Sequence, residues 1–329
     1  MDSGARRRRL QPAATAAMAT ALSALGWWHA TALQPLWWAA WLAPLPLLMA
    51  AVRLRAGPAA LATFTAFALG GASQWTYLHE VIRLPMTVVV AAITMPALAL
   101  VPVVLLFRAL ARRARPLAAA LAVPAAATGL SWLSALLSPH GSFGHLAYSQ
   151  ADALPVLQLA SLLGLWGVGF LVWLGPATLA ASLAGHAPRQ ARMRVLGAGA
   201  LAIAVALGFG AWRLQQDAPG PSLRIALLAI GGAGSGNADV ATAPGQQLLQ
   251  RYVAEIDRLA AQQRIDVFVG PESPLLVHDQ AITALQATAD RHGARILMGT
   301  EDRSGAEPRN AAWSSSPATT HRPRTTSAI

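Results

Sequence analysis

The sequence predicts a multi-pass α-helical membrane bundle followed by part of an α/β domain. Three observations support this fold class. Hydrophobic residues make up 55% of the 329 residues and charged residues only 12%, apolar runs recur through residues 1–213, and strand-like and helix-like segments alternate after residue 222. A soluble domain is about 25% charged, so the lipid bilayer is the natural solvent for the first part of this chain.

Seven apolar segments are candidate membrane spans. A bilayer core about 30 Å thick needs about 20 mostly apolar residues per helix, because unpaired backbone groups are costly in lipid. The first segment also resembles a signal sequence, since Arg6–Arg9 precede an Ala/Leu-rich run, and cleavage there would leave six spans. The segments are residues 12–30, 36–52, 58–78, 85–107, 117–137, 156–184 and 195–212.

The positions of the arginines predict the orientation, because basic loops are retained in the cytoplasm. They place the N-terminus in the cytoplasm and the residues after about 213 on the periplasmic side of a bacterial inner membrane. The net charge of +11 does not indicate a nucleic-acid partner, because the basic residues are scattered between apolar runs. Alternate loops carry Arg53 and Arg55, then Arg108, Arg112, Arg113 and Arg115, then Arg189, Arg192 and Arg194, whereas the opposite loops carry only Arg83.

Tryptophans cluster around the first external loop. An interfacial belt of aromatic residues is typical of membrane proteins, so we expect these side chains to be anchors rather than parts of a binding site. They are Trp27, Trp28, Trp37, Trp38 and Trp41.

A polar, glycine-rich loop covers residues 138–152, on the side predicted to be external. His145, Ser149 and Asp152 have the residue types of a nucleophilic triad, but three such residues arise easily by chance in a polar loop. His140 and His145 are possible metal ligands, yet no third ligand stands at a useful spacing. The sequence therefore favours solvated loop histidines.

An α/β segment follows a polar, proline-rich linker at residues 214–221. Buried strands are expected at 223–230, 265–269 and 294–299, and helices at 246–263 and 280–292. The run Gly231–Gly236 does not predict a phosphate-binding loop, because the chain has no Lys to reach the phosphates. A flexible loop is the better interpretation.

Glu272 is the one catalytic candidate. It stands in Gly270–Pro274 directly after the second expected strand, and carboxylates at the carboxyl ends of strands in α/β sheets lie where ligands usually bind. The alternative is a glutamate in a proline-bracketed surface turn.

Several sequence motifs together resemble the apolipoprotein N-acyltransferase family. They are Phe143–Gln150, Leu157–Leu171, Gly270–Ser273, Leu297–Thr300 and Arg309–Ala312. The resemblance implies a nitrilase-like α/β/β/α domain, of which residues 222–313 are the N-terminal part, mounted on a membrane domain of residues 1–213. It also implies transfer of an acyl chain from a phospholipid to the N-terminal amine of a diacylglyceryl-cysteine apolipoprotein, through a cysteine thioester. Glu272 matches the general base, and no cofactor or metal is expected.

The sequence departs from the family in lacking Cys and Lys altogether, whereas the family uses both in catalysis. Residues 314–329 have no strand or helix periodicity and read as a disordered tail. We therefore expect a truncated or frameshifted member. Three hypotheses follow: an acyltransferase, a catalytically dead homologue that still binds phospholipid or lipoprotein, and a fragment that does not fold stably because its sheet has an open edge.

Overall fold

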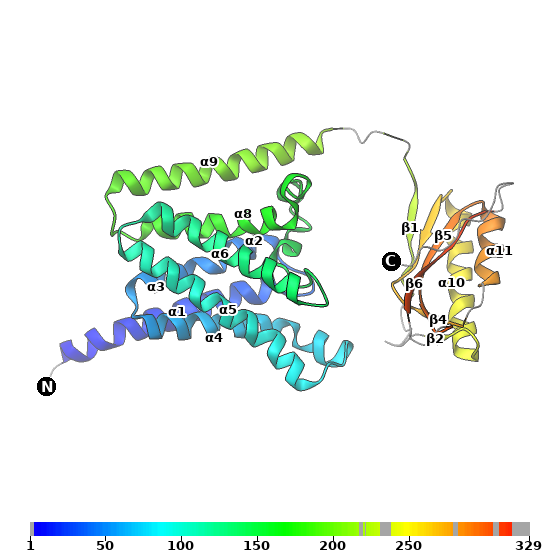
Figure 1. Ribbon diagram of the computed structural model, residues 1–329, viewed down its shortest axis with the longest axis horizontal. Helices are drawn as coiled ribbons and strands as arrows, with labels where there is room; N and C mark the ends of the chain where they lie inside the picture. The colour runs from blue at the N-terminus through cyan, green and yellow to red at the C-terminus, as the bar shows by residue number, and fades with distance from the viewer. Residues whose placement is uncertain are drawn as a thin grey trace. The chain divides into compact units, whose positions relative to one another are not determined.

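The computed structural model describes residues 3–216, 220, 222–230, 238–278, 282–304 and 309–317. The chain divides into two compact units, residues 1–217 and 218–329. The first is helical, and the second combines a small sheet with helices (Figure 1). The run Gly231–Gly236 and the end of the expected tail, from residue 318, lie outside the described residues.

The helices of the first unit follow the predicted apolar segments. Their bounds are α1 Ser3–Ala30, α2 Trp37–Leu42, α3 Pro44–Arg53, α4 Ala56–Gly71, α5 Met86–Arg112, α6 Pro116–Leu137, α7 Leu154–Leu157, α8 Ala160–Leu183 and α9 Arg189–Leu214.

Two predicted spans are less regular than the sequence suggested. The segment 36–52 is divided at Ala43 into α2 and α3, where Pro44 and Pro46 have no backbone N–H to donate. Ala43 keeps a right-handed helical conformation, so α3 continues α2 without reversing the chain. The segment 58–78 is regular only to Gly71 and continues through a 3₁₀ turn, η1 (Ala72–Gln74), and a π turn, η2 (Tyr77–Val81).

Four of the described helices are long and apolar enough to cross a membrane: α5, α6, α8 and α9. α2, α3 and α4 are each shorter than the roughly 20 residues that a straight crossing requires. By helix length and composition, the part of the chain that the structure describes thus supports a membrane bundle but does not establish seven spans.

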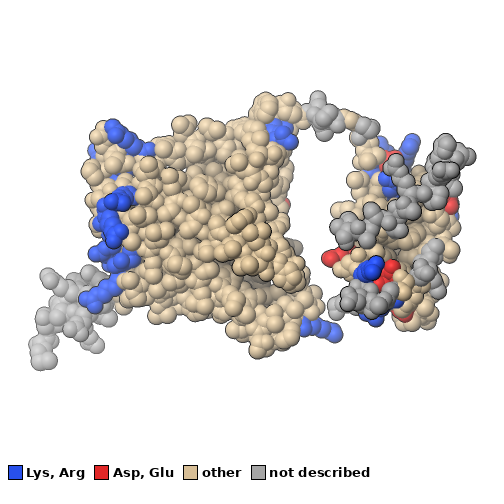
Figure 2. All heavy atoms as spheres, viewed as in Figure 1, with Lys and Arg blue, Asp and Glu red and all other residues tan. Residues whose placement is uncertain are grey.

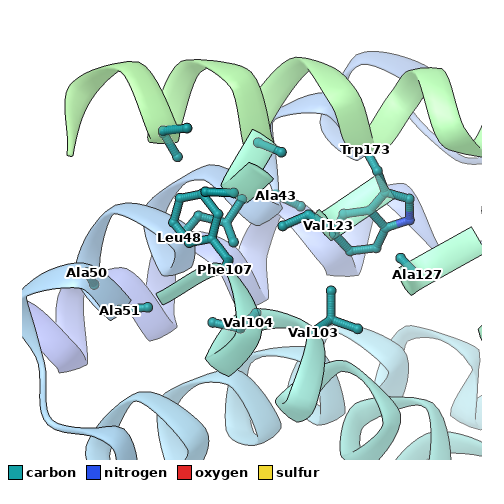
Figure 3. Close-up of a cluster of buried hydrophobic side chains, with 14 of the residues drawn as sticks. Ala43, Leu48, Ala50, Ala51, Val103, Val104, Phe107, Val123, Ala127 and Trp173 are labelled. Atoms are coloured by element: carbon teal, nitrogen blue, oxygen red, sulfur yellow. The ribbon is translucent and has the colours of Figure 1, made fainter. Parts of the chain in front are cut away.

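A shared core joins α3, α5, α6 and α8. The side chains of Leu48, Phe107 and Val123 are fully buried and Trp173 is nearly so, and they pack together in the cluster of Figure 3. Small residues allow close helix approach, as expected where lipid supplies no hydrophobic driving force between helices. A Cβ on Gly199 of α9, for example, would lie 2.4 Å from the Thr178 methyl group of α8.

Arginine side chains gather at one end of the helical unit, where α3 connects to α4, α5 to α6 and α8 to α9 (Figures 1 and 2). Two of them also cap a helix. Arg108 Nε donates to the Leu54 carbonyl (3.0 Å) and Arg112 Nη1 to the Val52 carbonyl (3.2 Å), so both satisfy carbonyl groups at the end of α3.

The second unit is built on a mainly parallel sheet. The strand order is β1-β3-β5-β4-β2, and β6 pairs antiparallel with β5. The first, third and fifth strands coincide with strands predicted from the residue pattern, and the sixth begins at the motif Arg309–Ala312, for which the resemblance implied a strand. The elements are β1 Ile225–Leu227, β2 Ala238–Asp239, α10 Ala243–Gln262, β3 Val267–Val269, β4 Leu275–Val277, α11 Thr283–His292, β5 Arg295–Asp302 and β6 Arg309–Ser315.

The tail predicted from residue 314 is wrong at its first two residues, because Ser314 and Ser315 belong to β6. β6 continues through Ser315, whose side chain is buried, because its backbone pairs with Ile296 of β5. The polar composition of this segment hid its place in the sheet.

Helices cover one face of the sheet, where Tyr252 and Ile256 of α10 and Leu285 of α11 pack on Phe268 and Ile296 (Figure 1). Strand register places Ala226, Phe268 and Ile296 on this face, so the residues that alternate with them face the other way. On that opposite face, Ile225 is 56% and Leu227 78% exposed.

Candidate functional site

An open cavity of about 970 Å³ lies within the helical unit. Its wall is built by the ends of α1 and α4 with the segments that follow them, the middle of α5, the C-terminal half of α6, one residue of α8, and the loop between α6 and η3 (Leu146–Gln150) together with η3 itself. This volume is at the upper end of that of small-molecule sites, about 300–1,000 Å³. The first unit can therefore hold a ligand with a long apolar part.

The helices supply an apolar wall. Trp27 stacks edge-on against Phe67 (centroids 4.7 Å apart) and lies 5.4 Å from the ring of Trp173. Trp27 is therefore part of the core, at 1% exposure, and its predicted role as an interfacial anchor is wrong. The large apolar side chains that the helices contribute to the lining are Trp27, Phe67, Met95, Leu100, Leu130 and Trp173.

The loop and η3 supply half of the polar side chains that line the cavity. Ser142 and Tyr148 share a hydrogen bond between their hydroxyl groups (2.8 Å). On the helical side, Gln74 Nε2 donates to the Thr31 carbonyl (3.0 Å). The cavity wall thus combines apolar side chains with polar ones, among them Thr31, Gln74, His140, Ser142, His145 and Tyr148.

A buried glutamine holds the loop against α2. Gln150 has no exposed surface; it accepts from Trp41 Nε1 (2.9 Å) and donates to the Trp37 carbonyl (3.0 Å) and to Ser149 Oγ (2.9 Å). Because an unpaired buried amide is costly, these bonds fix the loop where it forms the cavity wall. Trp41 is therefore a structural hydrogen-bond donor, which its expected anchoring role did not include.

His145 is buried, in contrast to the solvated histidine that the sequence favoured. Its side chain is 8% exposed, because the loop turns back into η3 and lays the ring against Trp166 and Gly169 of α8. Burial lowers the pKa of His145 to about 4. His140, five residues earlier in the same loop, is exposed.

The possible triad is not assembled. Ser149 Oγ donates to the Leu146 carbonyl (2.7 Å) and His145 Nδ1 accepts from the Ala147 amide (3.1 Å), while Asp152 is exposed. No hydrogen bond joins these three side chains among the residues that the structure describes. Nor do the described residues include a group of three or more His, Asp or Glu side chains that could hold a metal ion.

Glu272 lies in an interruption of the sheet, in the second unit. Strand β3 pairs with β5 up to Val269↔Leu297, and pairing resumes with β4 at Leu275↔Thr300. Residues 270–274 therefore stand opposite residues 298 and 299 alone, and the extra residues bulge out with Glu272 exposed among them. No hydrogen bond or ion pair of its carboxylate occurs within the described residues.

A glycine makes room for this bulge. A Cβ on Gly299 of β5 would lie 1.6 Å from the Glu272 carbonyl oxygen, and the Gly299 amide donates to the Pro271 carbonyl (3.1 Å). The segment Gly270–Pro274 thus directly follows strand β3, as the sequence predicted, and the structure adds the contact between Gly299 and the Glu272 main chain, which the sequence did not indicate.

Comparison with protein families identifies the helical unit. Residues 23–178 match the family model of the apolipoprotein N-acyltransferase N-terminal domain. The matched part of the chain, residues 23–178, belongs to the apolipoprotein N-acyltransferase family. A comparison with curated proteins found none that matches the chain.

The matched segment contains the whole cavity wall. The lining residues run from Trp27 to Trp173, so all of them fall inside residues 23–178. The motif Phe143–Gln150, on which the resemblance rested, forms the loop that closes this wall. The cavity is therefore a feature of the apolipoprotein N-acyltransferase N-terminal domain of this chain.

Proposed function

We propose that the helical unit binds the acyl donor of apolipoprotein N-acylation, a phospholipid, with an acyl chain in the cavity. One observation carries this proposal: a cavity of about 970 Å³, lined by apolar and polar side chains, lies entirely within the matched family domain. Acyl chains gain free energy from the apolar wall, and the polar loop offers hydrogen bonds to the ester and headgroup oxygens.

For the membrane topology we propose seven crossings, with the N-terminus in the cytoplasm and the second unit in the periplasm of a bacterium. The irregular helices α2–α3 and α4–η1–η2 supply the crossings beyond the regular ones, together with α1. The gathering of arginines at one end of the bundle supports a cytoplasmic location for that end (Figure 2).

For the second unit we propose the N-terminal part of a nitrilase-like domain, with Glu272 as its general base. Two observations support this. The bulge presents the Glu272 carboxylate outside the sheet, and among the described residues no helix covers the sheet face that carries Ile225 and Leu227, the face on which a second sheet packs in a sandwich. A positioned carboxylate would take the proton from a thiol and later from the attacking amine of the apolipoprotein.

Binding without turnover is the second candidate function. The thioester route requires a thiol nucleophile, and these 329 residues contain no Cys. Groups of a catalytic unit act together, so loss of the nucleophile removes nearly all of the rate. We therefore propose that these residues bind phospholipid and do not transfer its acyl chain by themselves.

The test measures both steps with the purified chain in detergent. Binding of a fluorescent diacyl phospholipid is expected, together with no acylation of a diacylated lipopeptide. Ala99→Phe, which fills the cavity from α5, should abolish binding, whereas Leu98→Phe, on the neighbouring exposed position, should preserve it. Acyl transfer that is lost in Glu272→Gln would refute the second candidate.

A further inference from the structure

Of the two ring nitrogens of His145, Nδ1 accepts a hydrogen bond and Nε2 has no partner among the residues that the structure describes. Its Nδ1 accepts a hydrogen bond from the Ala147 amide at the start of η3 (3.1 Å), so Nδ1 carries no proton. In a neutral imidazole the proton is then on Nε2, which becomes a donor. The turn that caps η3 therefore fixes the tautomer.

The surroundings of the ring keep it neutral. It stands edge-on to Trp166, with centroids 4.9 Å apart and planes at 82°, and burial is the one cause of its lowered pKa. No charged side chain contributes to that shift. At physiological pH the ring is therefore a neutral donor in a low-dielectric wall, where hydrogen bonds are strong.

Nε2 of His145 retains access to open space. Buried side-chain polar atoms without a partner among the described residues are Ser23 Oγ, Thr128 Oγ1, Arg192 Nε and Ser273 Oγ. Nε2 of His145 likewise has no hydrogen-bond partner among the described residues. Unlike those four atoms, however, Nε2 is not fully buried. His145 is one of the residues that line the cavity, so the cavity is the open space beside this side chain.

We propose that Nε2–H of His145 donates a hydrogen bond to the ester carbonyl oxygen of a phospholipid acyl chain in the cavity. This inference rests on the proposed function and adds the residue that recognises the ester. A neutral donor suits a neutral carbonyl better than a phosphate, which pairs more strongly with cations.

The test compares two lipids and two variants of the full chain. The lipids are a diacyl phosphatidylethanolamine and its dialkyl ether analogue, which has no carbonyl group. For the diacyl lipid, His145→Phe should weaken binding by about tenfold, which is the usual contribution of one hydrogen bond to affinity. His145→Gln retains an N–H donor and should weaken binding by less than about threefold. For the ether lipid, both variants should bind like the unmodified chain.

A second measurement avoids substitution. The chain is labelled with ¹⁵N-histidine for NMR, and the Nε2 signal of His145 is assigned as the one missing from the spectrum of His145→Gln. In the unmodified chain this signal should shift when the diacyl lipid is added but not when the ether lipid is added. Equal loss for both lipids in His145→Phe, or an Nε2 signal that does not respond, would overturn the inference alone. Absence of any phospholipid binding by the unmodified chain would overturn the proposed function and the inference with it.

Discussion

At the residue scale, His145 shows why local sequence reveals only part of the site. The sequence places it in a polar, glycine-rich loop, where histidines are usually solvated. Its burial depends on Trp166 and Gly169, which belong to a helix that follows the loop. The absence of Cys and Lys from these 329 residues, in contrast, can be read from the sequence alone.

The lowered pKa of His145 predicts a dependence of stability on pH. The pKa falls from 6.5 to about 4 on folding, so the unfolded chain takes up the proton first as the pH falls. The stabilisation is complete above about pH 6.5 and is lost as the pH approaches 4. The thermal midpoint in detergent should therefore fall more steeply between pH 7 and pH 4.5 in the unmodified chain than in His145→Gln.

His140→Gln is the matched control for this measurement. His140 lies in the same loop but is exposed, so its replacement should leave the pH dependence of the midpoint unchanged. Identical slopes for the unmodified chain and His145→Gln would mean that the His145 ring is not buried in the folded state.

At the element scale, the sequence predicts helices well and their interruptions poorly. Apolar runs locate α5, α6, α8 and α9 within a few residues. The division at Ala43 and the irregular turns after Gly71 depend on how α2, α3 and α4 pack, which periodicity does not show. The short strands β2 and β4 were missed because a two- or three-residue strand has no pattern of its own.

The contact between α8 and the loop predicts a sharp difference between two glycines. A Cβ on Gly169 would lie 2.6 Å from Cε1 of His145, whereas one on Gly129 of α6 would meet nothing within 4 Å. Gly169→Ala should displace the ring and weaken diacyl phospholipid binding about as much as His145→Phe. Gly129→Ala should leave binding intact and stabilise its helix by up to about 1 kcal/mol.

The bulge that carries Glu272 predicts different effects for a second pair of glycine substitutions, at Gly299 and Gly270. Gly299→Ala places a Cβ against the Glu272 main chain and should destabilise the second unit by about 3 kcal/mol. Gly270→Ala meets the Met298 side chain, which can turn away, and should cost about 1 kcal/mol. Hydrogen exchange of β3 and β5 in the full chain measures both. Equal protection in the two variants would contradict the described bulge.

At the scale of the whole molecule, the sequence predicts a membrane bundle and a separate α/β unit because composition changes abruptly between them. The cavity could not be predicted, since its wall brings together residues from Trp27 to Trp173 that only tertiary packing makes neighbours. The positions of the arginines in the sequence, however, already predict a membrane topology that can be tested.

The absence of Cys makes that topology easy to test, because any introduced thiol is the single one in these residues. His140→Cys lies in the loop proposed to be periplasmic and His186→Cys in the α8–α9 connection proposed to be cytoplasmic. A membrane-impermeant maleimide should label His140→Cys in cells with a permeabilised outer membrane alone. His186→Cys should react only after the inner membrane is opened. The reverse pattern would invert the proposed orientation.

The most direct test of the account is photocrosslinking of the chain in lipid nanodiscs with a phosphatidylethanolamine whose acyl chain carries a diazirine, followed by mass spectrometry. We predict labels on cavity-lining residues such as Leu100, Leu130 and Trp173, and their loss in Ala99→Phe. Labels confined to the exposed helix surface, at residues such as Leu98, Leu133 and Leu136, and unchanged in Ala99→Phe, would contradict an acyl-chain site in the cavity.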